Sequence, residues 1–275
     1  MKEQSKEKLT GSIVRQRMEE LAPPALAESW DNVGWQVGGD TVEVRAILVS
    51  LDVDQEVVEE AARHRATLIV AHHPILFRGL KRIDPTTYQG GMLRRLLCED
   101  ISVFAAHTNL DAVRGGVNDA LAEVLGLVPT HPLQAVRGAP EGWGFGAVCE
   151  MDSVTTEEMV RRVVQALGVA QPRVTRGRGA TPQHQRVALL GGSGASMIDD
   201  ALRAGCTLYI TGEVKYHEAQ DAARAGLTLI EAGHFHSERP VLRRLVDWLA
   251  PLGVPIVEST QVTSPFEADW KEGVG

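Results

Sequence analysis

Residues 46–73, AILVSLDVDQEVVEEAARHRATLIVAHH, decide the fold of this chain. The continuous apolar runs at 46–51 and 67–71 predict two buried strands. Between them, at 55–65, apolar residues recur at helical spacing and predict an amphipathic helix. The alternation continues with a helix at 92–99 and a strand at 101–106. Strands separated by helices are typical of parallel pairing, so we predict an α/β fold.

The second half of the chain repeats this pattern. Residues 47–70 align without a gap with residues 187–210, and the polarity matches although few residues are identical. We therefore predict two similar lobes, at about 1–130 and 131–275, with mostly parallel or mixed sheets flanked by helices. Chance agreement between two ordinary βαβ units is the alternative. Between the repeats we expect a strand at 142–150, a helix at 155–167 and a loop at 171–185.

The composition is that of a globular protein. Of the 275 residues, 44% are apolar and 23% are charged, which argues against disorder and against a coiled coil. The 36 acidic and 28 basic residues give a net charge of −8, which disfavours a broad surface for nucleic acid. The three cysteines form no CxxC pair, and no stretch approaches the roughly 20 apolar residues of a membrane span. We expect a cytoplasmic protein without a membrane partner.

Two adjacent histidines follow the predicted strand 67–71. His72 and His73 stand where the carboxyl end of a strand opens into a loop, which is the usual ligand side of an α/β sheet. Successive strand residues point to opposite sides, so such a pair can give one imidazole to each of two metal ions. Two solvated surface histidines are the alternative.

Further side chains that could bind a metal ion or transfer a proton follow two other predicted strands. His107 and Asp111 come after 101–106, although the Asp111 segment is also an ordinary polar turn before a helix. His234 and Glu238 come after 227–232, and a helix beginning at His234 would place both on one face, about 5–6 Å apart at Cβ. A capping Ser237 at an exposed helix start is the alternative there.

Together, His72, His73, Asp111, His234 and Glu238 offer three imidazoles and two carboxylates without a cysteine. This mixture suits Zn²⁺, Fe²⁺ or Mn²⁺ better than Ca²⁺, and Glu238 could bridge two ions. Two ions about 3.5–4 Å apart would lower the pKa of a shared water molecule.

Glu213, His217 and His107 are the candidate proton carriers of the site. Glu213 and His217 follow the predicted strand that ends near residue 210, and support of a metal ligand is the other role open to them. The glycine-rich stretch 190–196 could bind an anion, although a tight turn between strand and helix is the simpler interpretation. Trp30 could form a wall of the site, and a buried tryptophan is again the simpler interpretation.

Five ordered motifs resemble those of the Nif-three-like dinuclear metal-centre family, whose members are commonly labelled GTP cyclohydrolase 1 type 2 homologs. They are PALAESWDNVG at 24–34, AHHPILF at 71–77, AHTNLD at 106–111 with GVN at 116–118, ITGE at 210–213 and GHFHSE at 233–238. The resemblance spans about residues 10–260 and implies two similar lobes with a dinuclear metal site between them. It implies that His72 and His73 serve one metal each, with Asp111 on the first, His234 on the second and Glu238 bridging.

The resemblance also sets expectations about function. It implies a metal-dependent hydrolase that acts on a nucleotide or related phosphorylated small molecule through metal-activated water, and a homo-oligomer, specifically a hexamer. A non-enzymatic metal-binding regulatory or partner-binding protein is the alternative. Many bacterial relatives carry an extra inserted domain between the lobes, and the stretch 131–185 leaves no room for a large one here. Phe235 stands where the family usually has tyrosine, which removes a hydroxyl.

Overall fold

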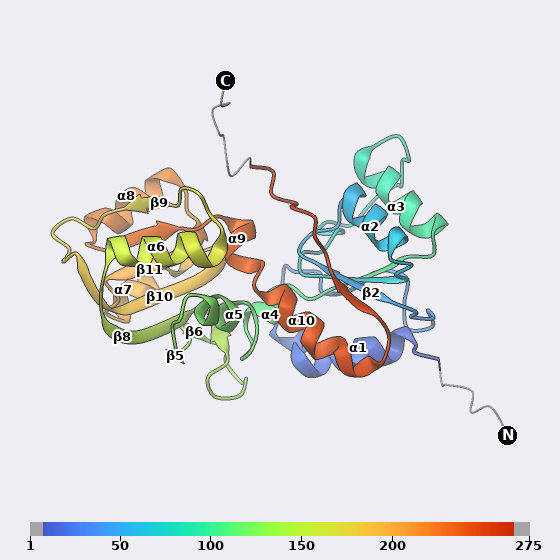
Figure 1. Ribbon diagram of the computed structural model, residues 1–275, viewed down its shortest axis with the longest axis horizontal. Helices are drawn as coiled ribbons and strands as arrows, with labels where there is room; N and C mark the ends of the chain where they lie inside the picture. The colour runs from blue at the N-terminus through green and yellow to red at the C-terminus, as the bar shows by residue number, and fades with distance from the viewer. Residues whose placement is uncertain (1–7, 267–275) are drawn as a thin grey trace. The chain divides into compact units, whose positions relative to one another are not determined.

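A computed structural model describes residues 8–266 as alternating strands and helices grouped into two units (Figure 1). Of the described residues, the first unit contains 8–110 and takes up Leu242–Thr263 near the other end of the sequence. The second unit is formed by Asp111–Val241 together with 264–266. The chain therefore leaves the first unit after Leu110, returns to it at Leu242 and leaves it again after Thr263.

A five-stranded sheet forms the centre of the first unit, in the order β1-β4-β3-β2-β13. Its strands are β1 (Gly34–Val37), β2 (Ile47–Ser50), β3 (Leu68–Ala71), β4 (Ser102–Ala105) and β13 (Ile256–Glu258). All neighbours are parallel except β1, which pairs antiparallel with β4. Every residue of β2, β3 and β4 is buried, which explains the continuous apolar runs in the sequence.

The helices of the first unit are α1 (Gly11–Leu21), α2 (Gln55–Arg63), α3 (Tyr88–Cys98) and the short turns η1 (Pro24–Leu26) and η3 (Ala250–Leu252). Two more helices, α4 (Thr108–Asp111) and α10 (Val241–Leu249), lie where the chain passes between the units. The core combines apolar residues of α2 and α3 with those of β2, β3 and β4. Asp54 caps α2 by accepting a hydrogen bond from the Val57 N–H group at 2.8 Å.

The second unit contains a six-stranded sheet in the order β5-β8-β10-β11-β12-β9. Its strands are β5 (Pro129–His131), β8 (Ala147–Thr155), β9 (Arg173–Thr175), β10 (Gln183–Ser193), β11 (Leu208–Glu213) and β12 (Thr228–Glu231). The central strands β10, β11 and β12 are parallel, and the others are antiparallel to their neighbours. A two-stranded ribbon pairs β6 (Gln134–Ala135) with β7 (Gly144–Phe145).

The helices of the second unit are α5 (Val117–Val124), α6 (Thr156–Leu167), α7 (Ile198–Arg203) with η2 (Ala195–Met197) before it, α8 (Tyr216–Arg224) and α9 (His234–Glu238). Thr155 and Glu158 form a capping box at the start of α6, and Gly168 ends the helix with φ of 69°. The prediction of a loop over all of 171–185 is wrong, because β9 and the first residues of β10 lie within this range.

The predicted α/β class, with mixed sheets flanked by helices, is confirmed. Each sheet has a parallel centre of buried strands, and both carry antiparallel strands towards an edge. Within residues 8–266, no helix has the length and apolarity that a membrane crossing requires.

Candidate metal centre

Three histidines of the first unit lie together at the carboxyl ends of neighbouring parallel strands. His72 and His73 follow β3, and His107 follows β4 by two residues. The ring centroids are 4.8 Å apart for His72 and His73, and 5.3 and 5.4 Å from each of these to His107. One ligand atom from each of the three lies within 4.8 Å of the others. The three imidazoles could therefore contribute to a metal site.

An oxygen atom faces Nδ1 of each of these histidines. The distances are 2.9 Å from His72 to the Ala106 carbonyl, 2.8 Å from His73 to Oδ1 of Asp52, and 2.8 Å from His107 to Oδ1 of Asp31. A carbonyl or ionised carboxylate only accepts hydrogen bonds, so each Nδ1 carries the proton. The lone pair is then on Nε2 of each ring, which is the form in which imidazole binds metals.

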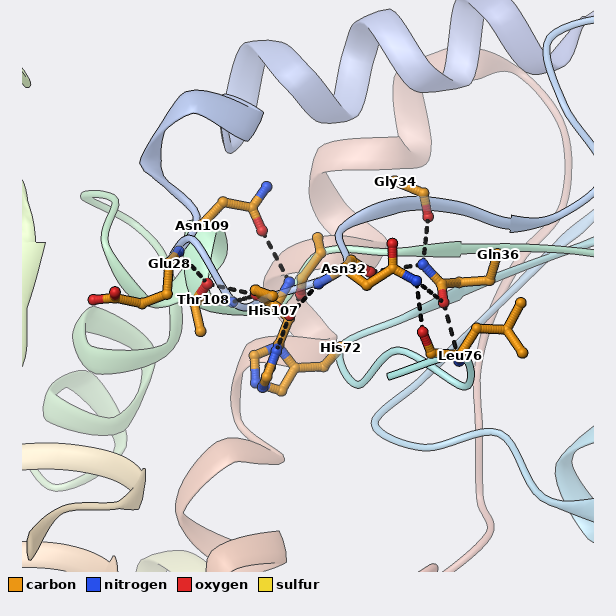
Figure 2. A network of polar contacts seen from close by, with 11 residues as sticks. Glu28, Asn32, Gly34, Gln36, His72, Leu76, His107, Thr108 and Asn109 are labelled. Atoms are coloured by element: carbon orange, nitrogen blue, oxygen red, sulfur yellow. Dashed lines mark hydrogen bonds and ion pairs between the residues drawn. The ribbon is translucent and has the colours of Figure 1, made fainter. Parts of the chain in front are cut away.

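The Asp31 side chain is completely inaccessible to solvent. Its carboxylate holds the segment of His107 and Thr108, two residues that Figure 2 labels. It accepts hydrogen bonds from the Thr108 N–H group at 3.0 Å and the Thr108 hydroxyl at 2.5 Å, in addition to that from His107. Burial alone would raise the pKa of Asp31, but these donors outweigh it and hold the pKa well below its usual range. Asp31 therefore stays ionised and fixes the orientation of His107.

Asp52 is the corresponding support for His73. One carboxylate oxygen faces Nδ1 of His73, and the other accepts a hydrogen bond from the hydroxyl of Thr263. Thr263 belongs to the returning C-terminal segment, beyond β13. Thr263, which is 211 positions after Asp52 in the sequence, thus orients the Asp52 carboxylate that contacts His73.

The second unit places His234, Glu238 and Glu213 together. Nε2 of His234 lies 3.2 Å from Oε2 of Glu238, which is one turn later on α9. Oε1 of Glu213, at the end of β11, lies 3.3 Å from Nδ1 of His234. The Glu238 side chain is only 5% exposed, whereas those of His234 and Glu213 are 35% and 46% exposed. A helix does begin at His234, so the condition under which His234 and Glu238 share one face is met.

Glycines at the ends of β10 and β11 make space for α9. A Cβ atom at Gly192 would collide with Oε1 of Glu238 and lie 3.3 Å from Nε2 of His234. A Cβ atom at Gly212 would lie 2.8 Å from the Ser237 hydroxyl, closer than real Cβ contacts come. Ser237 fixes this arrangement, because its hydroxyl donates to the His234 carbonyl at 2.8 Å and accepts from the Gly192 N–H group at 3.0 Å. The backbone of Gly192 and Gly212 therefore packs closely against α9 and leaves no room for a larger side chain at either glycine.

The glycine-rich stretch 190–196 forms this backbone wall. The N–H groups of Gly191, Gly192 and Gly194 donate to the Asn118 side chain, the Ser237 hydroxyl and the Glu213 carbonyl. Since these donors are engaged within the protein, the turn interpretation fits better than the anion-binding one.

The remaining predicted residues are placed differently. Asp111 is the last residue of α4, one turn after His107, and its carbonyl accepts a hydrogen bond from Asn118 at 2.9 Å. His217 is exposed on α8, where Nδ1 lies 3.3 Å from Oε1 of Gln220. The expectation that Trp30 is buried was wrong, because its side chain is 55% exposed.

Sequence reasoning missed Asp52, Thr263 and Glu231. Asp52 directly follows the strand run 46–51, an address equivalent to that of His72, and this signal could have found it. Glu231 is buried at the end of β12, where it pairs with Arg173 and accepts from the Val214 N–H group at 3.1 Å. Nothing in the local sequence distinguishes Thr263.

Comparisons with known proteins give matches over most of the chain. The family model described as Duf34/NIF3 (NGG1p interacting factor 3) matches residues 9–265. A Clostridium perfringens protein named GTP cyclohydrolase 1 type 2 homolog is 34% identical, over 91% of this chain and 96% of its own. A Schizosaccharomyces pombe protein named Protein NIF3 homolog is 33% identical, over 84% and 86%. The crystal structure of a Bacillus cereus protein related to NIF3 matches with a TM-score of 0.83 and 25% identity, over 95% and 99%.

Proposed function

Because the chain belongs to the Duf34/NIF3 family, we propose that it is a metal-dependent hydrolase acting on a nucleotide or related phosphorylated small molecule. The substrate class follows the name of its relatives, GTP cyclohydrolase 1 type 2 homolog. The observation that carries the proposal is the set of three imidazoles at one sheet edge, each with Nδ1 facing an oxygen acceptor. Such a set presents three Nε2 lone pairs in one place, which a histidine needed only for packing does not require.

The donor set fits two divalent cations. In this proposal His72 and His73 each serve one ion, Asp111 binds the first, His234 the second, and Glu238 is shared. Nitrogen and carboxylate donors without thiolates suit Zn²⁺, Fe²⁺ or Mn²⁺. The contact between Glu238, which is buried, and His234, with glycine at the position where a Cβ would strike Glu238, supports a ligand role for α9. When bound, such ions lower the pKa of water and stabilise negative charge in the substrate.

The supporting residues hold these donors in place. Asp52 orients His73, the Ala106 carbonyl orients His72, and Glu213 lies against Nδ1 of His234. We assign Glu213 to this orienting role because its carboxylate oxygen Oε1 lies 3.3 Å from Nδ1 of His234. Partners of this kind also raise the basicity of the ligand nitrogen.

His107 is the proton carrier in this proposal. Asp31 keeps the proton on Nδ1 and leaves Nε2 as the acceptor, and it stabilises the imidazolium that forms when Nε2 takes a proton. His217 is the weaker candidate, since it is exposed and contacts Gln220. The same arrangement serves ring opening of a purine and hydrolysis of a phosphoester, which differ in the atom attacked.

Metal content and products test the proposal together. Protein purified without chelator should hold about two metal ions per chain, and metal-loaded protein should convert GTP either to a formylated ring-opened product or to GDP, GMP and phosphate. The variant His107→Gln should keep both ions and lose turnover at least about 100-fold, the usual contribution of a general base. His64→Ala, an exposed histidine at the end of α2, is the control and should change neither.

Other outcomes reject parts of the proposal. Loss of a metal ion in His107→Gln would make His107 a ligand and remove it as the proton carrier. One ion per chain would refute the shared site at Glu238. Two ions without turnover of GTP would favour the non-enzymatic regulatory alternative. Light scattering of the same protein tests the homo-oligomer that the sequence resemblance implies.

A further inference from the structure

Two aromatic side chains beside the histidine cluster of the first unit are exposed to solvent. Trp30 is 55% exposed and Phe77 is 50% exposed, and their ring centroids are 5.6 Å apart with the planes tilted by 47°. Both rings also lie near His107, with centroid distances of 6.1 Å from Trp30 and 6.4 Å from Phe77. Exposed aromatic surface of this kind is unfavourable in water and commonly marks a binding site.

Hydrogen bonds of the neighbouring residues fix the backbone that carries Trp30 and Phe77. On the Trp30 side, the Glu28 carbonyl accepts from the Asp31 N–H group at 2.9 Å, and the Asp31 carboxylate is tied to His107 and Thr108. Trp30 therefore lies in a hydrogen-bonded turn, and the side chain of the next residue, Asp31, is buried. The exposure of Trp30 follows from the geometry of this turn.

The same network reaches Phe77 through its neighbour in sequence. The Leu76 carbonyl accepts from Nδ2 of Asn32 at 2.6 Å, and the Leu76 N–H group donates to Oε1 of Gln36 at 3.1 Å. Nε2 of Gln36 donates in turn to the Asn32 carbonyl at 2.7 Å. Figure 2 shows these contacts joining the segment of Asn32 and Gln36 to Leu76. Both aromatic residues are thus held by polar contacts to a common backbone frame, a preorganised arrangement suited to binding.

A basic segment continues directly from Phe77. Residues 78–82, RGLKR, are exposed and carry three positive charges within five residues; we refer to them as the basic loop. The chain as a whole has a net charge of −8, so the basic loop differs in sign from the overall charge of the protein. Arg82 lies 3.5 Å from Asp84 and is partly neutralised, whereas Arg78 and Lys81 add cationic groups next to the aromatic pair.

We propose that Trp30 and Phe77 form a stacking platform for the planar heteroaromatic ring of a phosphorylated ligand, and that the basic loop binds its phosphate. Rings of this size stack on exposed aromatic faces, and arginine and lysine bind phosphate. The closeness of both rings to His107 places the ligand at the histidine cluster. The inference rests on the proposed function for its substrate class, and it adds the residues that recognise the ring.

Binding of GMP, measured by equilibrium dialysis, tests the platform without requiring turnover. The purified protein should bind GMP at least about tenfold more tightly than ribose 5-phosphate, which has the phosphate but no ring. Trp30→Leu and Phe77→Leu should each weaken GMP binding about fivefold to tenfold and leave ribose 5-phosphate unchanged, while Trp30→Phe restores most of the affinity. Tyr88→Leu is the matched control, since Tyr88 is 61% exposed at the start of α3 and should have no effect.

The basic loop is tested with the same ligands. The double variant Arg78→Ala with Lys81→Ala should weaken GMP and ribose 5-phosphate alike, and added salt should reduce the difference from the unmodified protein. Guanosine, which has the ring but no phosphate, should bind this variant as it binds the unmodified protein. Because all four side chains are exposed, their replacement should leave the melting temperature within about 2 °C.

The outcomes separate this inference from the proposed function. Equal binding of GMP and ribose 5-phosphate, or unchanged GMP affinity in Trp30→Leu, would overturn the platform even if the protein hydrolyses GTP. GMP binding that depends on Trp30 would support it even if no metal-dependent turnover is found. A change in oligomeric mass by light scattering in Trp30→Leu, with GMP affinity unchanged, would overturn it in favour of an interface with a second copy of the chain.

Discussion

Glu60 offers a sharp test of how the returning C-terminal segment is attached to the first unit. Its side chain belongs to α2 and is only 2% exposed. It accepts hydrogen bonds from the Ser259 hydroxyl at 2.5 Å, the Thr260 N–H group at 3.0 Å and the Thr260 hydroxyl at 2.6 Å. One carboxylate thus anchors the chain just beyond β13 to the helix.

The expected loss of stability differs between two replacements. Glu60→Gln can keep one oxygen for both Thr260 donors, and the Ser259 hydroxyl can turn to accept from the new amide. We expect this variant to lower the free energy of unfolding by about 1–2 kcal/mol, since only charge assistance is lost. Glu60→Ala leaves all three donors without a carboxylate and should cost about 3–4 kcal/mol. Urea denaturation at pH 7 measures both.

The dependence on pH has a definite sign. Burial alone would raise the pKa of Glu60, but the donors from Ser259 and Thr260 outweigh it and lower the pKa. A carboxyl group with a lowered folded-state pKa stabilises the fold fully above its unfolded pKa, about 4.3, and progressively less below it. The difference between the unmodified protein and Glu60→Gln should therefore shrink as the pH falls below about 4.

Glu59→Ala is the matched control, because Glu59 is next in sequence but 48% exposed and paired with Arg95. Its replacement should cost less than about 1 kcal/mol. Stability of Glu60→Ala within about 0.5 kcal/mol of the unmodified protein at pH 7 would refute the anchoring role. A penalty for Glu60→Gln that grows as the pH falls would refute the electrostatic reasoning.

Two further substitutions probe the candidate metal ligands. Asp52→Asn should lower metal affinity about 10- to 100-fold in competition with a chelator, because it removes the charged support of His73; unchanged affinity would mean that this contact does not matter for binding. Gly192→Ala should cost at least about 2 kcal/mol in thermal denaturation and reduce metal content, because its Cβ would strike Glu238. Gly168→Ala has nearly the same φ, 69° against 70°, but open space around its Cβ, so it should cost only about 1 kcal/mol. Equal costs for the two glycines would show that backbone strain alone matters.

Local patterns in the sequence were sufficient to predict the parallel strands and the position of the histidines after them. The buried runs of β2, β3 and β4 leave a continuous apolar signal, and His72 and His73 directly follow one of them. The spacing of four between His234 and Glu238 predicted only that a helix beginning at His234 would place both on one face, and α9 does begin there.

The supports of the histidines could not be predicted in this way. Asp31 and His107 are separated by 76 positions, and Asp52 and Thr263 by 211, so their contacts produce no periodicity. Trp30 was expected to be buried on its hydrophobicity alone, whereas the neighbouring Asp31 takes the inward position and finds its donors there. The hydrogen bonds of Asp31 with His107 and Thr108 therefore determine which of the two neighbouring side chains is buried, and the greater hydrophobicity of Trp30 does not.

The parallel pairing of β13 with β2 has a consequence for how the protein is made. A ribosome delivers Ile256–Glu258 about 200 residues after their partners Ile47–Val49, and the whole of Asp111–Val241 emerges in between. The edge of β2 that later pairs with β13 therefore has no partner strand for about 10–40 s of synthesis, at the usual 5–20 residues per second. An open strand edge can pair with other chains, so the chain is exposed to aggregation at this edge during the interval. Because Thr263 arrives later still, the contact that orients Asp52 towards His73 is among the last to form, so the candidate metal centre is completed only when synthesis of these residues is over.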